Sequence, residues 1–299
     1  MKNLIKYYYD LEIDSIVYSF GEYKFKYKSF DYCLVSIERE INEINDIYNL
    51  CAYLHRLNIP CHEIIPNNLN SLITDVSQRK YVLLKKYVTS NQLITVDDII
   101  YFNLNTTYNW NFDSLKRISW DELWTRKIDY YEYQIGQIGK QYPMLYNTLC
   151  YFTGLTESGL QLIKMTESSG KLSVCHKRIY KNMTLTEFYN PLNFVIDYRI
   201  RDISEYYKQN IFNLSDYLYS KLYYTINTYF DQNDVLLLFI RFFLPTFYFD
   251  LYEEIIRGNE KEEKILEIIE NIKMYEIFLK KIYVYIKTYI RIPRIEWLE

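Results

Sequence analysis

Residues 23–51 of the chain, YKFKYKSFDYCLVSIEREINEINDIYNLC, change their hydrophobic period partway along. Residues 23–28 alternate aromatic and lysine side chains with a period of two, which predicts a half-buried β-strand. Residues 32–35 (Tyr-Cys-Leu-Val) predict a further strand. Over residues 37–51 the apolar side chains recur every three to four positions, which is typical of an amphipathic helix, with Ser36 as its cap. The stretch therefore predicts a small sheet followed by one helix.

The segments downstream add two strands and then a mainly helical body. Residues 71–74 and 81–88 have strand composition and are separated by a polar turn. Helical periodicity dominates from about residue 95 onward, and short extended pieces interrupt it at residues 172–175 and 194–196. The expected order is strands, one helix, strands, and a helical body with a short strand pair in its middle.

This order predicts an α+β, bilobal protein-kinase-like fold. Residues 1–88 would form the small N-lobe with its antiparallel sheet. Residues 89–299 would form the mostly helical C-lobe. The length of 299 residues suits two closely packed lobes.

The composition excludes few partners but is unusually aromatic. The formal net charge of −3 gives no general argument for nucleic-acid binding, so no nucleic-acid partner is expected. The chain holds 35 Tyr and 16 Phe, an excess that AT-rich codons largely explain. Cross-linking of tyrosines is the functional alternative.

Cysteine and histidine positions indicate neither a disulfide framework nor a metal site. Five cysteines are scattered without a CxxC pair, and three histidines lack metal-ligand spacing. Cys61 and His62 are adjacent, which we interpret as a coincidence within a loop rather than a ligand pair. These features favour a reduced, intracellular site of synthesis.

No transmembrane segment is expected, and we interpret the protein as soluble. The first ten residues are too polar for a signal peptide. The most apolar run, residues 235–249, is short and interrupted by Arg241 and Pro245, which favours a buried core helix. Trp120 and Trp124 share one predicted helix face and are expected to anchor the core rather than stack on a ligand.

Phosphoryl transfer in such a fold requires a glycine-rich phosphate cradle and a lysine on the third strand. Gly21 is the only glycine in the predicted N-lobe, and the expected lysine position, within residues 34–37, holds none. Lys24, Lys26 and Lys28 alternate along their strand, so we interpret them as an exposed face.

The predicted catalytic loop has lost its carboxylate. Residues 174–178 resemble the His-x-Asp start of the loop in aminoglycoside-phosphotransferase-like kinases, with His176 in place and Arg178 where aspartate is expected. A guanidinium cannot act as a general base. The loop asparagine would fall on Met183, and Asn182 lies one position away.

One part of the phosphotransfer apparatus is kept. Asp197 ends the apolar stretch Asn193–Ile196, in the position where such kinases hold magnesium, and is a vestigial metal position. Arg201 and Asp202 are assigned structural roles, with Asp202 expected to cap the next helix. No catalytic residue and no metal ligand is therefore predicted.

Five segments together carry a family resemblance. They are residues 154–162 (GLTESGLQL), 175–179 (CHKRI), 191–205, 238–249 and 292–298 (IPRIEWL). In this order they resemble the YutH-type spore-coat proteins of endospore-forming bacteria, which are related to the kinase-like spore-coat S-type proteins. The N-terminal lobe matches only in general pattern.

The resemblance implies a protein of the endospore coat, synthesised in the mother-cell cytoplasm, with other spore-coat proteins as partners. It also implies that loss of the aspartate at Arg178 is shared by the family. Our first hypothesis is a non-catalytic protein of coat structure or assembly that has no cofactor. The alternatives are a divergent kinase that uses ATP and magnesium through Asp197, and a nucleotide sensor without transfer activity.

Overall fold

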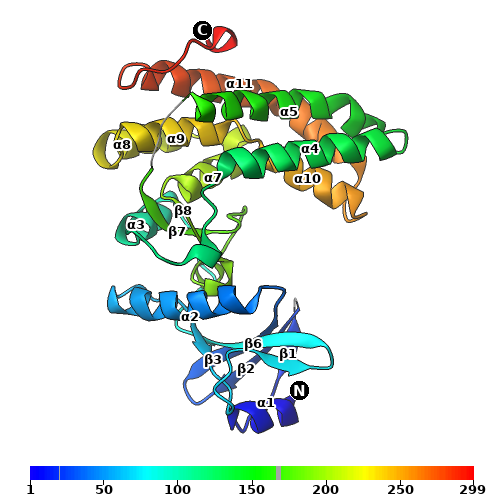
Figure 1. Ribbon diagram of the computed structural model, residues 1–299, viewed down its shortest axis with the longest axis vertical. Coiled ribbons are helices and arrows are strands. Elements are labelled where there is room, and N and C mark those ends of the chain that lie inside the picture. The colour runs from blue at the N-terminus through cyan, green and yellow to red at the C-terminus, as the bar shows by residue number, and fades with distance from the viewer. Residues whose placement is uncertain (20, 166–169) are drawn as a thin grey trace. The chain divides into compact units, whose positions relative to one another are not determined.

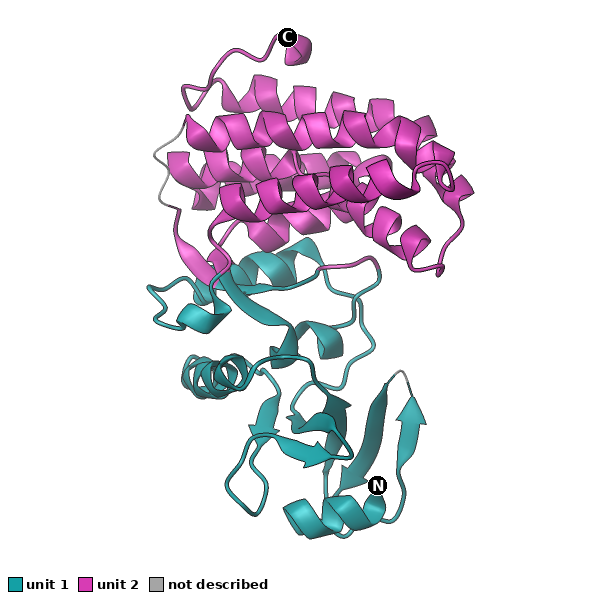
Figure 2. Cartoon of the chain, turned by 45° about the vertical axis from the view of Figure 1, so that its right-hand side comes forward, with its two compact units in different colours: residues 1–116, 174–178, 182–196 teal, residues 117–173, 179–181, 197–299 magenta. Residues whose placement is uncertain are grey.

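The computed structural model describes residues 1–19, 21–165 and 170–299, which pack as two compact units (Figure 2). Unit 1 comprises residues 1–116, 174–178 and 182–196, and unit 2 comprises residues 117–173, 179–181 and 197–299. Each unit is thus assembled from segments that are distant in sequence. The lobe boundary expected after residue 88 stays a prediction, because compactness alone does not define lobes.

Unit 1 is built on an antiparallel sheet. Its strands, in the part of the chain that the structure describes, are β1 (Val17–Ser19), β2 (Glu22–Tyr27), β3 (Phe30–Ser36), β4 (Glu63–Ile65), β5 (Thr74–Val76) and β6 (Arg79–Lys86). Their spatial order is β1-β2-β3-β6-β4, and β5 also pairs with β6. The expected strands at 23–28 and 32–35 are confirmed as β2 and β3.

The hairpin between β5 and β6 is tighter than expected. Ser77 and Gln78 both have positive φ, 48° and 66°, so two residues suffice to reverse the chain. The strand predicted at residues 71–74 therefore lies further along the chain, at Thr74–Val76.

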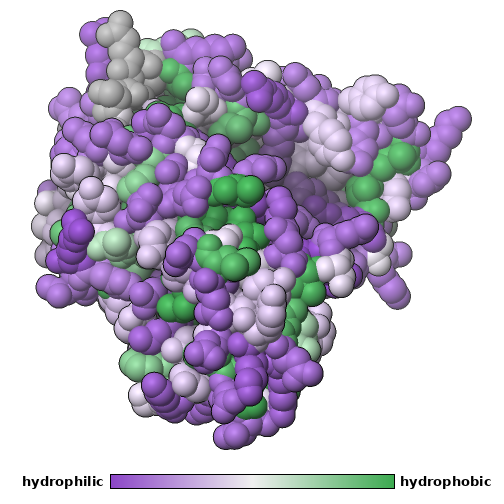
Figure 3. All heavy atoms as spheres, turned by 60° about the horizontal axis from the view of Figure 1, so that its bottom comes forward, coloured by the Kyte–Doolittle hydropathy of each residue, from purple (hydrophilic) through white to green (hydrophobic). Residues whose placement is uncertain are grey.

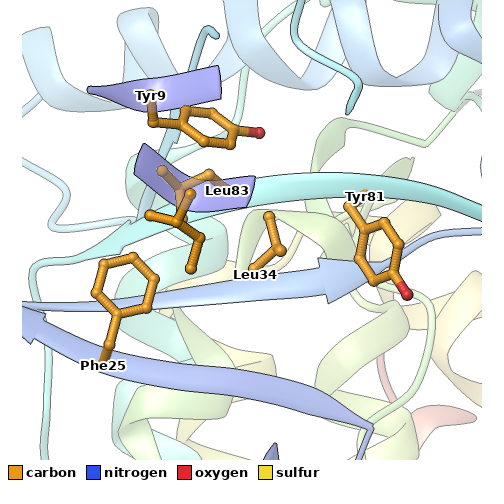
Figure 4. Packing of buried hydrophobic residues seen from close by; sticks show 6 residues of the cluster. Tyr9, Phe25, Leu34, Tyr81 and Leu83 are labelled. Carbon is orange, nitrogen blue, oxygen red and sulfur yellow. The ribbon is translucent and has the colours of Figure 1, made fainter. Parts of the chain in front are cut away.

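One face of this sheet is covered by the N-terminal helix α1 (Lys2–Tyr9). Ile5 and Tyr9 of α1 pack against Phe25, Leu34 and Leu83 from three neighbouring strands (Figure 4). Because side chains alternate along a strand, the residues beside these point to the opposite face. Burial of this apolar cluster fixes the register of the sheet.

Helix α2 (Ile41–Arg56) begins later than the sequence period indicates. The Ile37 amide donates a hydrogen bond to the Lys80 carbonyl at 2.9 Å, so residue 37 continues the sheet edge. Glu40 is the N-cap residue, in a capping box with Glu43. The prediction that Ser36 caps the helix is therefore wrong.

The remainder of unit 1 contains short elements. These include helices α3 (Val96–Asn105) and α6 (Leu185–Phe188). Strands β7 (Leu172–His176) and β8 (Phe194–Tyr198) pair as a two-stranded sheet, of which residues 174–176 and 194–196 belong to unit 1. The extended pieces expected at residues 172–175 and 194–196 are thus confirmed.

Unit 2 consists of packed helices (Figure 1). Those described are α4 (Trp120–Ile138), α5 (Pro143–Lys164), α7 (Arg201–Gln209), α8 (Asp216–Tyr229), α9 (Gln232–Phe242), α10 (Thr246–Ile256) and α11 (Ile265–Ile286). Gly159 lets α5 approach the end of α9 closely, because a Cβ at Gly159 would lie 2.9 Å from the Cβ of Phe243, the C-cap residue of α9. Trp120 and Trp124 are buried, which confirms that they are core residues.

The apolar stretch expected to form a core helix is folded as α9 and α10. Residues 232–256 are long and apolar enough to cross a membrane by length and composition, yet most of their apolar part is buried within the protein. Pro245 separates the two helices. This burial is typical of core helices in a globular protein.

Candidate functional site

In unit 1, His176 at the end of β7 is a buried structural residue. Its Nε2 lies 2.8 Å from the Phe188 carbonyl oxygen, and its ring stacks on Phe188 with centroids 4.3 Å apart. Phe102 and Phe194 complete an aromatic cage around the ring. These contacts hold the segment after β7 against α6.

Arg178 stands in the expected position of the catalytic carboxylate. Its side chain is exposed, and its backbone is held by Asn193. The Asn193 Oδ1 accepts a hydrogen bond from the Arg178 amide at 3.3 Å, and its Nδ2 donates to the Arg178 carbonyl at 3.0 Å. Asn193 therefore fixes the backbone of Arg178, whose guanidinium cannot act as a general base.

Asn182 serves the backbone of this segment. It is exposed and has a φ of 66°, the left-handed conformation that asparagine tolerates better than most residues. The next residue, Met183, is buried and its carbonyl accepts a hydrogen bond from Ile94. Asn182 thus forms a turn that precedes a buried anchor.

In unit 2, Asp197 near the end of β8 is fully buried and engaged on both oxygens. Oδ1 accepts hydrogen bonds from Trp120 Nε1 at 2.9 Å and from the Tyr198 amide at 2.7 Å. Oδ2 accepts from Arg201 Nη1 in an ion pair. Both oxygens of the Asp197 carboxylate are therefore occupied by groups of the protein.

A second buried carboxylate, that of Glu205 on α7, forms ion pairs with two more cations. Its Oε1 accepts from Lys208 Nζ at 2.8 Å and from Arg241 Nε at 2.9 Å. Thr246 donates to its Oε2 at 2.8 Å. We call Asp197, Arg201, Glu205, Lys208 and Arg241 the buried charge cluster.

Aromatic rings cover this cluster. The Arg241 guanidinium lies over the ring of Trp120 at 4.8 Å and over that of Trp124 at 5.4 Å. These two indoles stack on each other with centroids 5.4 Å apart. Trp120 therefore binds Asp197 through its nitrogen and Arg241 through its face.

Burial shifts the ionisation of the cluster. It raises the pKa of Asp197, an effect that Arg201 and Arg241 oppose. It also lowers the pKa of Lys208 to about 7, against the stabilising charge of Glu205. For Glu205 the two nearby cations outweigh burial and lower the pKa of the carboxyl.

Asp202 lies inside helix α7 rather than capping it. The helix begins at Arg201 with Ile200 in the N-cap position, and no side chain caps it. Asp202 is fully buried in the first turn of α7, where the helix dipole stabilises a negatively charged carboxylate. The predicted cap is wrong. The structural role predicted for Arg201 is expressed in its ion pair with Asp197.

Unit 1 contains a cavity with a volume of about 760 Å³. Its walls include Lys24 and Lys26 of β2, Lys86 of β6, and Thr186 and Asn190 from the segment that connects β7 to β8. Lys24 Nζ lies 3.5 Å and Lys86 Nζ 4.0 Å from the same Glu22 carboxylate oxygen. Lys24 and Lys26 thus border a cavity instead of only an open strand face.

The residues in the kinase positions do not fit a nucleotide-bound magnesium ion. Asp197 already accepts three hydrogen bonds, and Arg201 occupies the oxygen that a cation would need. Across residues 1–19, 21–165 and 170–299, no three His, Cys, Asp or Glu side chains come together as a metal site. We therefore derive no step through a metal.

The chain has a kinase-like fold of the aminoglycoside-phosphotransferase type. The chain is similar to an aminoglycoside phosphotransferase from Alicyclobacillus acidocaldarius, with a TM-score of 0.63, 10% identity, and coverage of 94% of each chain. It is also similar to spectinomycin phosphotransferase in its AMP-bound complex, with a TM-score of 0.61, 12% identity, and coverage of 92% of this chain and 96% of the other.

The family model described as "Spore coat putative kinase YutH" matches residues 2–282, and the chain belongs to this family. A curated relative, the endospore coat-associated protein YutH of Bacillus subtilis, is 23% identical over 290 residues, covering 86% of this chain and 85% of its own length. The kinase-like fold and the family expected from the sequence are both confirmed.

Several residues of the site were not predicted as functional. Lys86, Glu205 and Lys208 were unassigned, and Arg241 was noted only as an interruption of an apolar run. An arginine inside an apolar run was the signal in the sequence that could have indicated a buried ion pair, because a buried arginine requires an anionic partner. Trp120 was predicted as a core residue, and its bond to Asp197 adds a second role.

Proposed function

We propose that this member of the spore-coat family is a non-catalytic protein that acts in the structure or assembly of the endospore coat. The observation that carries the proposal is the engagement of Asp197 by Trp120 and Arg201 within a buried charge cluster. Arg178 in place of the catalytic aspartate supports it. The fold is then kept for its shape and surface.

The surface suits contacts with other coat proteins. Several tyrosines are exposed, among them Tyr7 at 75% and Tyr133 at 71%. On one face of the molecule, apolar residues lie in patches between hydrophilic ones (Figure 3). Aromatic side chains are the commonest anchors of protein interfaces, so such residues are the candidate contacts with coat partners.

Two assays test this proposal. The first follows transfer of the γ-phosphate from ATP to water, to the protein itself and to sporulating-cell extract, in the wild type and in Arg178→Asp. We expect no turnover in either, because restoring one carboxylate leaves Asp197 engaged. Turnover by the wild type that Asp197→Asn removes would contradict the non-catalytic assignment.

The second assay locates the protein. A tagged chain expressed during sporulation from its native promoter is expected to appear in the mother-cell cytoplasm and then in the extracted coat fraction. Recovery only from the spore core or the vegetative cell would contradict the coat assignment.

The second candidate function is binding of a phosphate-bearing small molecule without transfer. The cavity of unit 1 favours it, since about 760 Å³ is within the size range of ligand sites and lysines line it. Binding of ATP in the presence of EDTA, with no phosphate transfer on adding magnesium, supports this candidate.

A further inference from the structure

Two cysteines and a histidine of unit 1 form a cluster apart from the positions discussed above. Cys51 lies on α2, and His55 follows it by one helical turn on the same face. Cys61 precedes β4 and directs its Sγ at the Cys51 carbonyl oxygen, 3.9 Å away. The His55 Nε2 lies 2.8 Å from the Cys61 carbonyl oxygen. Helix α2 and the segment before β4 therefore meet through these three residues.

We propose that Cys51 and Cys61 are an oxidisable thiol pair that closes into an intramolecular disulfide in the presence of peroxide. The thiol of Cys61 gives up its proton and attacks one peroxide oxygen, forming a sulfenic acid and releasing water. The thiol of Cys51 then attacks this sulfur and expels the second oxygen as water. Two thiols and one hydrogen peroxide thus become one disulfide and two waters.

The electrostatic environment selects Cys61 as the first nucleophile. A hydrogen bond from the Cys51 thiol and the neighbouring His55 lower the pKa of Cys61 to about 6, although burial acts in the opposite direction. The pKa of Cys51 is raised by the same hydrogen bond between the two thiols and by burial. The thiolate is the reactive form, so the two cysteines have distinct roles as attacking and resolving residues.

Burial determines which oxidants can act. Cys51 is 3% exposed and Cys61 is fully buried, whereas the His55 ring lies at the edge of the cluster. A small peroxide can reach such a site by local opening, and a bulky aromatic disulfide reagent cannot. Cys33, also buried, is a matched comparison, since burial raises the pKa of its thiol to about 12.

The bond would tie α2 to the strand that follows. The two cysteines are ten positions apart in the sequence, so the loop that the disulfide closes is short, and the Cys61 Sγ already lies 3.9 Å from the Cys51 carbonyl oxygen. The disulfide is expected to raise Tm by a few degrees, because it restricts the unfolded chain.

The test uses the full chain carrying Cys150→Ser, because Cys150 is exposed and would cross-link molecules. Native protein is treated with hydrogen peroxide, unfolded, and alkylated. The count of free thiols is expected to fall from four to two, since the chain has five cysteines and one has been replaced. Trypsin cleaves after Arg56, so the disulfide should join the peptides holding Cys51 and Cys61.

Two variants test the roles assigned to the two cysteines. In Cys51→Ser, Cys61 is expected to accumulate sulfenic and sulfinic acid instead of a disulfide, whereas Cys33→Ser should still form the bond. A count that stays at four, or a bond that involves Cys33 or Cys175, would overturn the proposal. If Cys51→Ser does not fold, the peptide map of the Cys150→Ser protein decides alone.

Discussion

The buried charge cluster of unit 2 and the lysine-lined cavity of unit 1 use charged residues in opposite ways. In the cluster, the carboxylates of Asp197 and Glu205 are buried and form ion pairs with three cations, of which Arg201 is partly exposed. In the cavity, Lys24 and Lys86 approach one carboxylate loosely and line open space. The difference is that the Asp197 carboxylate is held by contacts within unit 2, whereas the lysines of unit 1 border a cavity of about 760 Å³.

The largest expected effect comes from removing the anion that two cations share. Glu205→Ala leaves Lys208 and Arg241 buried without their partner. We expect the free energy of unfolding to fall by about 3–5 kcal/mol, measured by urea denaturation.

The control is Glu254→Ala, which removes an exposed carboxylate paired with Arg257 at 3.0 Å. It should cost about 0–1 kcal/mol. Equal losses in the two variants would show that the cluster is not the stabilising element described.

The next effect is a loss of stability on acidification that His62 of unit 1 is expected to cause. His62 beside the cavity is 1% exposed, and burial lowers its pKa from 6.5 to about 4. The unfolded chain therefore binds this proton first on acidification. The contribution of neutral His62 to the free energy of unfolding is fully present above pH 6.5. It is lost as the pH falls from 6.5 through 4, by up to about 3 kcal/mol.

The measurement is the unfolding free energy of the wild type and of His62→Gln from pH 6.5 to 4. The wild type should lose more stability than the variant. His55→Gln is the control, since a hydrogen bond with Cys61 raises the pKa of His55 to about 9, outside this window. Parallel curves for the wild type and His62→Gln would show that His62 does not carry the acid sensitivity.

A smaller effect separates the two roles of Trp120. Trp120→Phe removes the hydrogen bond to Asp197 and keeps an aromatic ring under Arg241. The expected loss is about 2 kcal/mol, because the acceptor is charged. Trp110→Phe in unit 1 removes a bond to the neutral Thr106 carbonyl and should cost about 1 kcal/mol in the same assay. A loss for Trp120→Phe no greater than that for Trp110→Phe would contradict a charge-assisted bond.

The smallest effect tests the cavity. Lys86→Ala should leave the unfolding free energy within about 1 kcal/mol of the wild type, since its ion pair is long. We expect it to weaken ATP binding in EDTA roughly threefold to tenfold by calorimetry. Lys140→Ala, an exposed lysine of unit 2, is the matched control. Equal affinities would remove the cavity as an anion site.

Local patterns predicted the elements better than the site. The period of two in β2 and the helical period of α4 are local, so both were expected correctly. The start of α2 was missed because Ile37 fits the helical period by chance, whereas its amide bonds to Lys80, far along the chain. Trp120 and Asp197 are 77 residues apart, and no local spacing relates them. The pairing of Asp197 with a tryptophan and an arginine is visible only in three dimensions.

The role of Asp197 is tested most directly by the thermal shift of the wild type and of Asp197→Asn with ATP, in magnesium and in EDTA. We expect magnesium to add nothing to the shift with ATP in either protein, because Arg201 and Trp120 already occupy the Asp197 carboxylate. An additional shift in magnesium that Asp197→Asn abolishes would contradict it.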